Sequence, residues 1–160
     1  MIFIKNNVPS LKNSKIATTI GKAPNKRVIL LPSKTVKKYL KAMGIKKYSA
    51  KGYVEEYATR ENLFRKAVGD YFDGCQKPVV VKFFFVRGSK HKFDIINAMQ
   101  IICDLLVAHG YIEDDNADCL VTMPMRCGGK WYGYDKDRPG VWLKIHEVAP
   151  WAGEFGGIGE

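Results

Sequence analysis

Carboxylates gather at the two ends of one expected helix, against the charge of most of the chain. Asp94 stands where an apolar periodic run begins, and the acidic cluster EDDNAD, Glu113–Asp118, follows soon after that run ends. Carboxylate oxygens are the ligands that Mg²⁺ and Mn²⁺ prefer in proteins. Crowded carboxylates also repel one another unless a cation or a basic partner offsets them. These residue types and their spacing indicate a metal site that faces a polyanion.

Both acidic features also have a plainer explanation. A carboxylate at a helix N-terminus accepts hydrogen bonds from the exposed backbone N–H groups, so Asp94, three residues before Asn97, could be only a helix cap. An acidic turn without other support is a surface loop about as often as it is a metal site. The residue types alone leave both alternatives open.

The net charge of +10 is distributed unevenly along the chain. Residues 1–54 contain 13 Lys and Arg and no Asp or Glu, whereas residues 94–160 contain 5 basic and 11 acidic side chains. A basic segment neutralises phosphates and releases counterions, which gives salt-dependent affinity for nucleic acid. A solubilising face or an anionic protein partner would produce the same pattern. The basic segment includes Lys34, Lys37, Lys38, Lys41, Lys46, Lys47 and Lys51.

Length and composition predict one compact domain, residues 1–150, followed by a glycine-rich C-terminal tail, residues 151–160. No apolar run approaches the roughly 20 residues that span a bilayer. The opening residues lack the pattern of a secretory signal, so we expect a cytoplasmic protein without a membrane partner. The four cysteines form no CxxC pair, which predicts free thiols in place of a zinc site.

Periodicity predicts an α+β fold with a mixed sheet and two long helices packed on it. Ser33 can cap a helix that Gly44 ends, and a second helix is expected over Val54–Phe72. The run Val79–Val86 is apolar on both alternating faces, which is typical of a strand in the middle of a covered sheet. Further elements are strands at 2–5, 119–123 and 141–148, an apolar run at 28–31, and the helix from Asp94 to about His109.

The stretch Lys92–Pro124 resembles the RusA family of Holliday-junction resolvases. That family has Asp-x-Asp-Asn at a helix start, an Asp about seven residues after the Asn, a Gly closing the helix, and then Asp-Asp. Met123–Lys130 is similar to its Met-Pro strand end and glycine turn, and Asn6–Lys15 to its N-terminal proline loop. The matching positions of the main motif here are Asp94, Asn97, Asp104, Gly110, Asp114 and Asp115.

The resemblance implies a RusA-like, intertwined or two-fold homodimer that resolves Holliday junctions or other branched DNA, in recombination or in processing viral or mobile-element DNA. The implied cofactor is Mg²⁺ or Mn²⁺, with no organic cofactor. Such an ion acidifies a water for attack on phosphorus and stabilises the leaving oxygen. Asp94, Asp114 and Asp115 would be catalytic and would bind the metal together with Asp118. The implied DNA contacts are Lys37, Lys38, Lys41, Arg87, Lys90, Lys92, Asn97 and Lys130.

Two positions depart from the family pattern, because Ile96 replaces its second Asp and Gln100 replaces a lysine. In one interpretation the site is rebuilt, with Glu113, Asn97 or Asp118 completing the metal shell and Arg87, Lys90 or Lys92 supplying the cation. In another, the protein is a noncatalytic basic DNA-binding dimer. We favour the rebuilt site because the other motif positions remain. A third possibility is a basic protein whose acidic turn only binds a partner.

Geometry constrains the rebuilt site. A helix over Ile95–His109 rises about 22 Å, whereas an extended return over Tyr111–Asp115 covers roughly 17 Å. Asp115 therefore reaches Asp94 in the same subunit only if those residues run straight back, or else a second subunit supplies it. The sequence does not choose between the two arrangements.

The remaining candidates for DNA contact are aromatic residues and a histidine. Trp131, Tyr132 and Tyr134 lie in a glycine-broken loop with Lys130, Lys136 and Arg138, and they could stack on bases at a branch point or pack against the sheet edge. The three histidines form no triad with a Ser or Cys, so we expect surface or packing roles, with a phosphate contact as a further possibility for His91.

Overall fold

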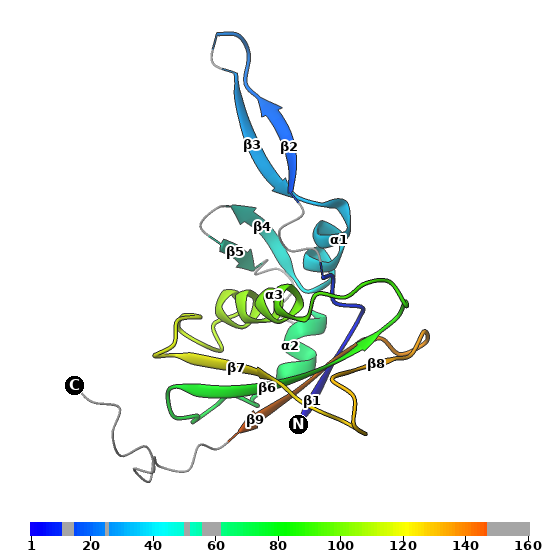
Figure 1. The fold of residues 1–160 in the computed structure, drawn as a ribbon. Helices are drawn as coiled ribbons and strands as arrows, with labels where there is room; N and C mark the ends of the chain where they lie inside the picture. Colours follow the sequence, from blue (N-terminus) through cyan, green and yellow to red (C-terminus); the bar gives the residue numbers. More distant parts are fainter. Residues whose placement is uncertain (11–14, 25, 50–51, 56–61, 147–160) are drawn as a thin grey trace, which may run out of the picture.

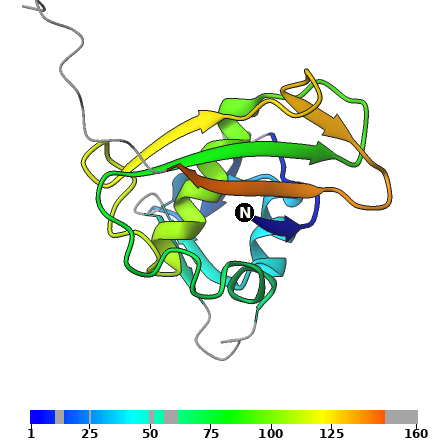
Figure 2. The same cartoon turned by 90° about the horizontal axis from the view of Figure 1, so that it is seen from below.

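The computed structural model describes residues 1–10, 15–24, 26–49, 52–55 and 62–146. It has an α+β fold in which helices lie on one face of a mixed five-stranded sheet, as Figures 1 and 2 show from two directions. Two separate two-stranded hairpins stand outside that sheet. Within this part of the chain, no helix combines the length and the apolar character that crossing a bilayer demands.

Strand β6 (Val79–Arg87) lies in the middle of the sheet, as its apolar run predicts. On one side it pairs antiparallel with β9 (Gly140–His146), which in turn pairs with β1 (Ile2–Lys5). On the other side, β7 (Leu120–Pro124) runs parallel to its first half and β8 (Tyr132–Tyr134) runs parallel to its second half. The predicted strands at 2–5, 119–123 and 141–148 are confirmed over their described residues, while 147–148 lie outside them.

The alternation of β6 explains how the sheet binds its helices. Val81, Phe83 and Phe85 are fully buried on the face that the helices cover, whereas Phe84 is half-buried on the opposite face. Burying apolar side chains of this size contributes about 1.5–3 kcal/mol each. This face of β6 is therefore the centre of the core.

Helix α3 (Ile95–Ala108) connects β6 to β7 and packs on the sheet. Asp94 caps its N-terminus, His109 ends it, and Gly110 follows with a φ of 76°. Residues on its inner side are fully or almost fully buried: Ala98, Met99, Ile101, Ile102, Cys103, Leu105 and Leu106. The predicted helix from Asp94 to about His109 is confirmed.

Helix α1 (Lys34–Ala42) also matches its prediction. The Ser33 hydroxyl accepts from the backbone N–H of Val36 at 3.4 Å, and Val36 and Leu40 are buried. Gly44 follows with a φ of 81°, a left-handed conformation that favours glycine.

The prediction of a second long helix over Val54–Phe72 is wrong. Residues Gly52–Glu55 form strand β5, and α2 covers only Leu63–Val68. Asn62 is the true N-cap, since its Oδ1 accepts from the backbone N–H of Arg65 at 2.9 Å, and Gly69 ends the helix with a φ of 54°. Phe64 and Val68 of this segment are nevertheless buried, while residues 56–61 lie outside the described part.

Two hairpins lie in the chain before α2. Strands β2 (Lys15–Ile20) and β3 (Arg27–Pro32) pair antiparallel, as do β4 (Ile45–Ser49) and β5. The apolar run at 28–31 lies within β3, whereas periodicity gave no signal for β2, β4 or β8. The tail at 151–160 lies outside the described residues.

Candidate functional site

Asp94 is exposed and makes two hydrogen bonds at the start of α3. Its Oδ1 accepts from the backbone N–H of Asn97 at 3.1 Å, and its Oδ2 accepts from the Asn97 side-chain amide at 2.7 Å. The capping role is therefore confirmed. A carboxylate offers roughly four lone-pair positions, so each oxygen of Asp94 retains capacity for a cation.

The acidic turn after α3 is held by its own side chains. Asp114 accepts from the backbone N–H of Asp115 at 2.8 Å and from the Asn116 amide at 2.7 Å. The Asn116 side-chain oxygen accepts in turn from the backbone N–H of Asp118 at 3.0 Å. Such local bonds form a turn without any ion. Asp114, Asp115 and Asp118 are all exposed, so they remain accessible to one.

A basic partner of the acidic turn escaped sequence reasoning. The Lys77 ammonium donates to the Glu113 carboxylate, and this contact lowers the pKa of Glu113 and raises the pKa of Lys77. The two residues are distant in sequence, but they meet because Val79 of β6 pairs with Leu120 of β7. Lys77 thus offsets part of the crowded negative charge, and Glu113 already has a partner.

The two acidic groups lie at opposite ends of α3 within one subunit. Its 14 residues span about 21 Å. Because β6 and β7 are parallel, Asp94 follows the C-terminal end of β6 and the acidic turn precedes the N-terminal end of β7. Figure 1 shows the β6–α3 connection and the α3–β7 connection at opposite ends of the sheet.

The extended return that a site within one subunit needs does not exist. The backbone N–H groups of Tyr111 and Ile112 both donate to the carbonyl of Leu106, at 2.9 and 3.4 Å, so the chain curls at the helix end. Ile112 is buried there. In the described ranges, no three His, Cys, Asp or Glu side chains form a group that could hold a metal ion. Of the two arrangements that the sequence left open, the described residues therefore do not form the one in which Asp94 meets Asp114, Asp115 and Asp118 of its own chain.

Two exposed cations closely precede Asp94 in the sequence, whereas Arg87 is buried. Lys90 and Lys92 are exposed, and the Lys90 ammonium lies 5.5 Å from the ring centroid of Tyr134. Arg87 is only 5% exposed; its guanidinium donates to the carbonyl of Val8 and lies 4.4 Å from the centroid of Phe93. Burial also lowers the pKa of Arg87. Arg87 thus anchors the N-terminal loop at Val8, and little of its side chain is open to a DNA contact.

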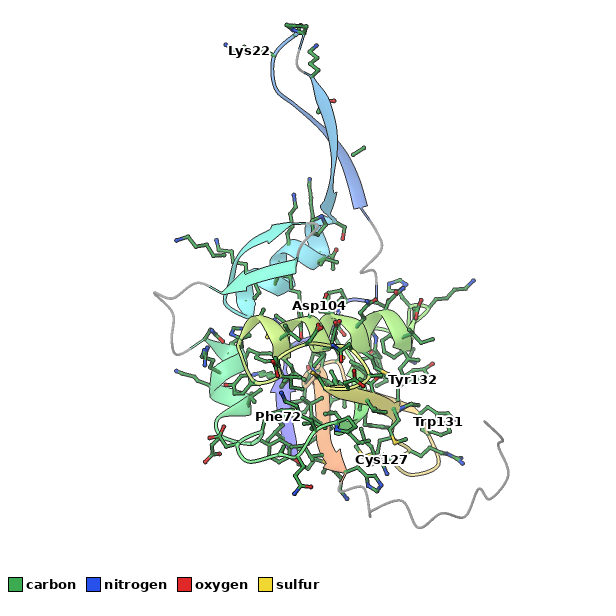
Figure 3. The ribbon with its side chains drawn as sticks, turned by 90° about the vertical axis from the view of Figure 1, so that its left-hand side faces the viewer. Lys22, Phe72, Asp104, Cys127, Trp131 and Tyr132 are labelled. Carbon is green, nitrogen blue, oxygen red and sulfur yellow. The ribbon has the colours of Figure 1, made fainter. Side chains whose placement is uncertain are left out.

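Three aromatic rings form an exposed surface near the α3 N-terminus. Trp131, Tyr132 and Tyr134 are 51%, 50% and 49% exposed. Tyr132 packs at 5.3 Å against Phe93, the residue before Asp94, and the Arg126 guanidinium lies 5.2 Å from the Trp131 ring centroid. Pairing of β8 with β6 fixes the position of Tyr132 and Tyr134. Each ring is thus partly packed at the sheet edge and partly open to solvent. Figure 3 marks Trp131 and Tyr132 on this side of the molecule.

The remaining predicted DNA contacts lie in three places: on α1, in the aromatic loop and at the start of α3. Lys38 and Lys41 are exposed on α1, where Lys37 is half-buried. Lys130 is exposed in the turn of the aromatic loop, where its backbone pairs with Cys127 in both directions at 2.9 and 3.0 Å. Asn97 is half-buried and bound to Asp94.

The histidines and cysteines differ in exposure, and Cys127 is an exposed thiol in the aromatic loop. His109 is 4% exposed, its Nε2 lies 2.8 Å from the carbonyl oxygen of Met43, and its ring stacks on Phe64 at 4.8 Å. His91 and His146 are exposed. All four cysteines are free, as predicted.

Comparisons with protein-family profiles, with curated protein sequences and with solved structures find no match. The likeness to RusA resolvases therefore rests on the motif residues alone.

Proposed function

We propose that this protein is a Mg²⁺- or Mn²⁺-dependent endonuclease that cuts branched DNA as a two-fold dimer, with each metal site shared between subunits. One observation carries the proposal: the exposed carboxylates of the resolvase-like motif lie at the two ends of one helix. A two-fold axis across α3 sets two copies of that helix antiparallel. Asp94 of one subunit would then meet Asp114 and Asp115 of the partner subunit.

The surroundings of Asp94 support a polyanionic ligand. Lys90 and Lys92 are exposed beside it, and a helix N-terminus attracts negative charge. These cations would offset phosphate charge while Asp94, the partner's Asp114 and the partner's Asp115 hold the ion. The partner's Asp118, together with the Asn97 that lies beside Asp94, could complete the coordination shell of the ion. The bound ion supplies acidification of a water and stabilisation of the leaving oxygen.

The aromatic surface supports branched DNA over plain duplex. Bases at a branch point can unstack, and the exposed halves of Trp131, Tyr132 and Tyr134 offer flat partners for them. Lys90 and Arg126 lie over two of these rings, so base and phosphate contacts would be made together. Paired symmetric cuts in a four-way junction would also suit a two-fold protein.

A specific observation favours a second candidate, the noncatalytic DNA-binding dimer. Ile96 is 72% exposed at the position where the family has its second Asp, so no carboxylate is present there. In this candidate Asp94 is only the cap of α3, a role that its two bonds to Asn97 already fulfil.

The test is cleavage of a synthetic four-way junction with Mg²⁺ or Mn²⁺. We expect paired symmetric nicks from the native protein and from Asp73→Asn, which removes an exposed carboxylate outside the resolvase-like motif. We expect no nicks from Asp94→Asn. A junction that is bound but uncut by the native protein supports the noncatalytic candidate. Equal affinity for junction and duplex at about 150 mM salt supports a protein whose acidic turn binds another partner.

Mixing two inactive variants tests whether the sites are shared. In a mixed dimer of Asp94→Asn and Asp115→Asn subunits, a shared arrangement puts both changes into one site and leaves the other intact. Random mixing should then restore single nicks at about one quarter of the native site number. Sites built within one subunit would all stay inactive in the mixture. Single nicks would thus separate the two arrangements directly.

A further inference from the structure

The β2–β3 hairpin projects from the rest of the molecule. Its strands pair with each other, from Lys15 with Pro32 to Ile20 with Arg27, and belong to no larger sheet. Six residues per strand give a length of about 17–20 Å. Figures 1 and 3 show it standing away from the body in two perpendicular views, with Lys22 at its far end in Figure 3.

The hairpin is basic, and its charge concentrates at the tip. Residues 15–32 contain four basic residues and no Asp or Glu, and three of the four, Lys22, Lys26 and Arg27, flank the turn. Gly21–Pro24 and Lys26 are exposed. Like charges held this close repel one another, so an anionic ligand would relieve the repulsion.

A two-stranded hairpin alone in water is only marginally stable. The exposed surface of the hairpin extends from the tip along β2, where Ala17 and Thr19 are also exposed. A projecting ribbon with a basic tip has the shape and charge to enter a groove of duplex DNA, which admits a two-stranded β-ribbon.

We propose that the β2–β3 hairpin is a DNA-binding arm that lies in a groove of one duplex flanking the branch point. The choice of DNA as ligand rests on the proposed function, but the arm is a separate site from the α3 ends. The ammonium groups of Lys22 and Lys26 at the tip are donors that can bind phosphate oxygens.

The basic surface continues from the arm into the body. Strand β3 leads through Ser33 into α1, and Figures 1 and 3 place that helix at the base of the hairpin. Lys34, Lys38 and Lys41 of α1 are exposed there. A duplex bound at the arm could thus also contact these lysines of the basic segment.

Charge reversal at the tip tests the arm. The double variant Lys22→Glu with Lys26→Glu is compared with Lys5→Glu and Lys144→Glu, which makes the same change of net charge at exposed positions of β1 and β9. Fluorescence anisotropy measures binding to plain duplex and to a four-way junction in EDTA over a range of salt concentrations. Without divalent metal, failure of cleavage cannot affect the result.

The tip variant should bind both DNAs about tenfold or more weakly, and its slope of log K against log salt should fall by about 2. The control pair should change the slope by less than about 1. The neutral variant Lys22→Gln with Lys26→Gln should show the same loss of slope, and circular dichroism checks that each variant is folded. Equal slopes for the tip and control variants would overturn the proposal. So would a tip variant that loses its dimer by light scattering while its slope is unchanged, because the arm would then clasp a second copy.

Discussion

The two ends of helix α3 differ in how their carboxylates are held. At the N-terminus, Asp94 is bonded to the helix it begins and has Lys90, Lys92 and an exposed aromatic surface nearby. At the other end, the acidic turn is closed by its own side chains and by Lys77. The first end combines a carboxylate with exposed cations, and the second presents negative charge. In the proposed function, a polyanion and a second subunit would be the complementary partners of the two ends.

The largest expected effect is a loss of stability when the buried face of α3, the helix that separates the two acidic groups, is truncated. Ile102 is fully buried on α3, so Ile102→Ala should destabilise the protein by about 2–5 kcal/mol through lost transfer energy and a cavity. Ile96→Ala, at 72% exposure on the same helix, should stay within about 0.5 kcal/mol. Urea unfolding measures both variants. Similar costs at the two positions would show that α3 is not buried as described.

The aromatic surface near the N-terminus of α3 should contribute to the affinity for junction DNA. Base stacking is worth about 1–3 kcal/mol per base, so Trp131→Ala should weaken junction binding roughly 5- to 150-fold. Leu63→Ala is the control, because Leu63 is exposed to a similar degree, 48%, on α2. Anisotropy in EDTA measures both affinities. If the two variants bind alike, the aromatic surface has no part in DNA recognition.

Removing a carboxylate should lower the stability of the protein at the N-terminus of α3 but not in the acidic turn. Asp94→Ala removes the α3 cap and should cost about 1 kcal/mol, whereas Asp94→Asn retains an acceptor and should cost much less. Asp115→Ala removes an exposed carboxylate that caps no helix, so its effect should stay within about 0.5 kcal/mol. Thermal unfolding at neutral pH gives the comparison. A cost for Asp115→Ala equal to that for Asp94→Ala would remove the distinction.

The smallest expected effect is the pH dependence of the acidic turn. Lys77 lowers the pKa of Glu113, so their stabilisation is present above the pKa of unfolded Glu and is lost as the pH falls through the lowered folded value. On the alkaline side it is lost as the pH rises through the raised pKa of Lys77. Both side chains are largely exposed, so the change in stability should be small.

Carboxyl NMR titration of Lys77→Met should show the pKa of Glu113 moving up toward its ordinary value. Lys144→Met, which removes an exposed ammonium of β9, should leave the Glu113 titration as it is in the native protein and serves as the control. An unaltered Glu113 titration in the variant would mean that the pair does not form in solution.

Elements with local signals were predictable from sequence, and elements held by distant partners were not. Helix α3 has a cap, a periodic apolar face and a terminal glycine within its own residues, and β6 is an unbroken apolar run. The helix predicted over 54–72 failed because its first residues pair with β4, which supplies backbone partners from outside the segment. The Lys77–Glu113 contact escaped for the same reason, since the β6–β7 register creates it.

The sequence by itself determined the unequal charge distribution, the carboxylates at both ends of α3 and the strands and helices with strong local patterns. Only the tertiary structure decided that Asp94 and the acidic turn face apart, that Arg87 is buried, and that a basic hairpin projects from the body. Caps, turn residues and apolar periodicity determine structure within a few residues. Strand pairing between distant segments determines which loops lie together at one end of the sheet. Parallel pairing of β6 with β7 requires α3 to span the sheet from end to end, and this separates its two acidic groups.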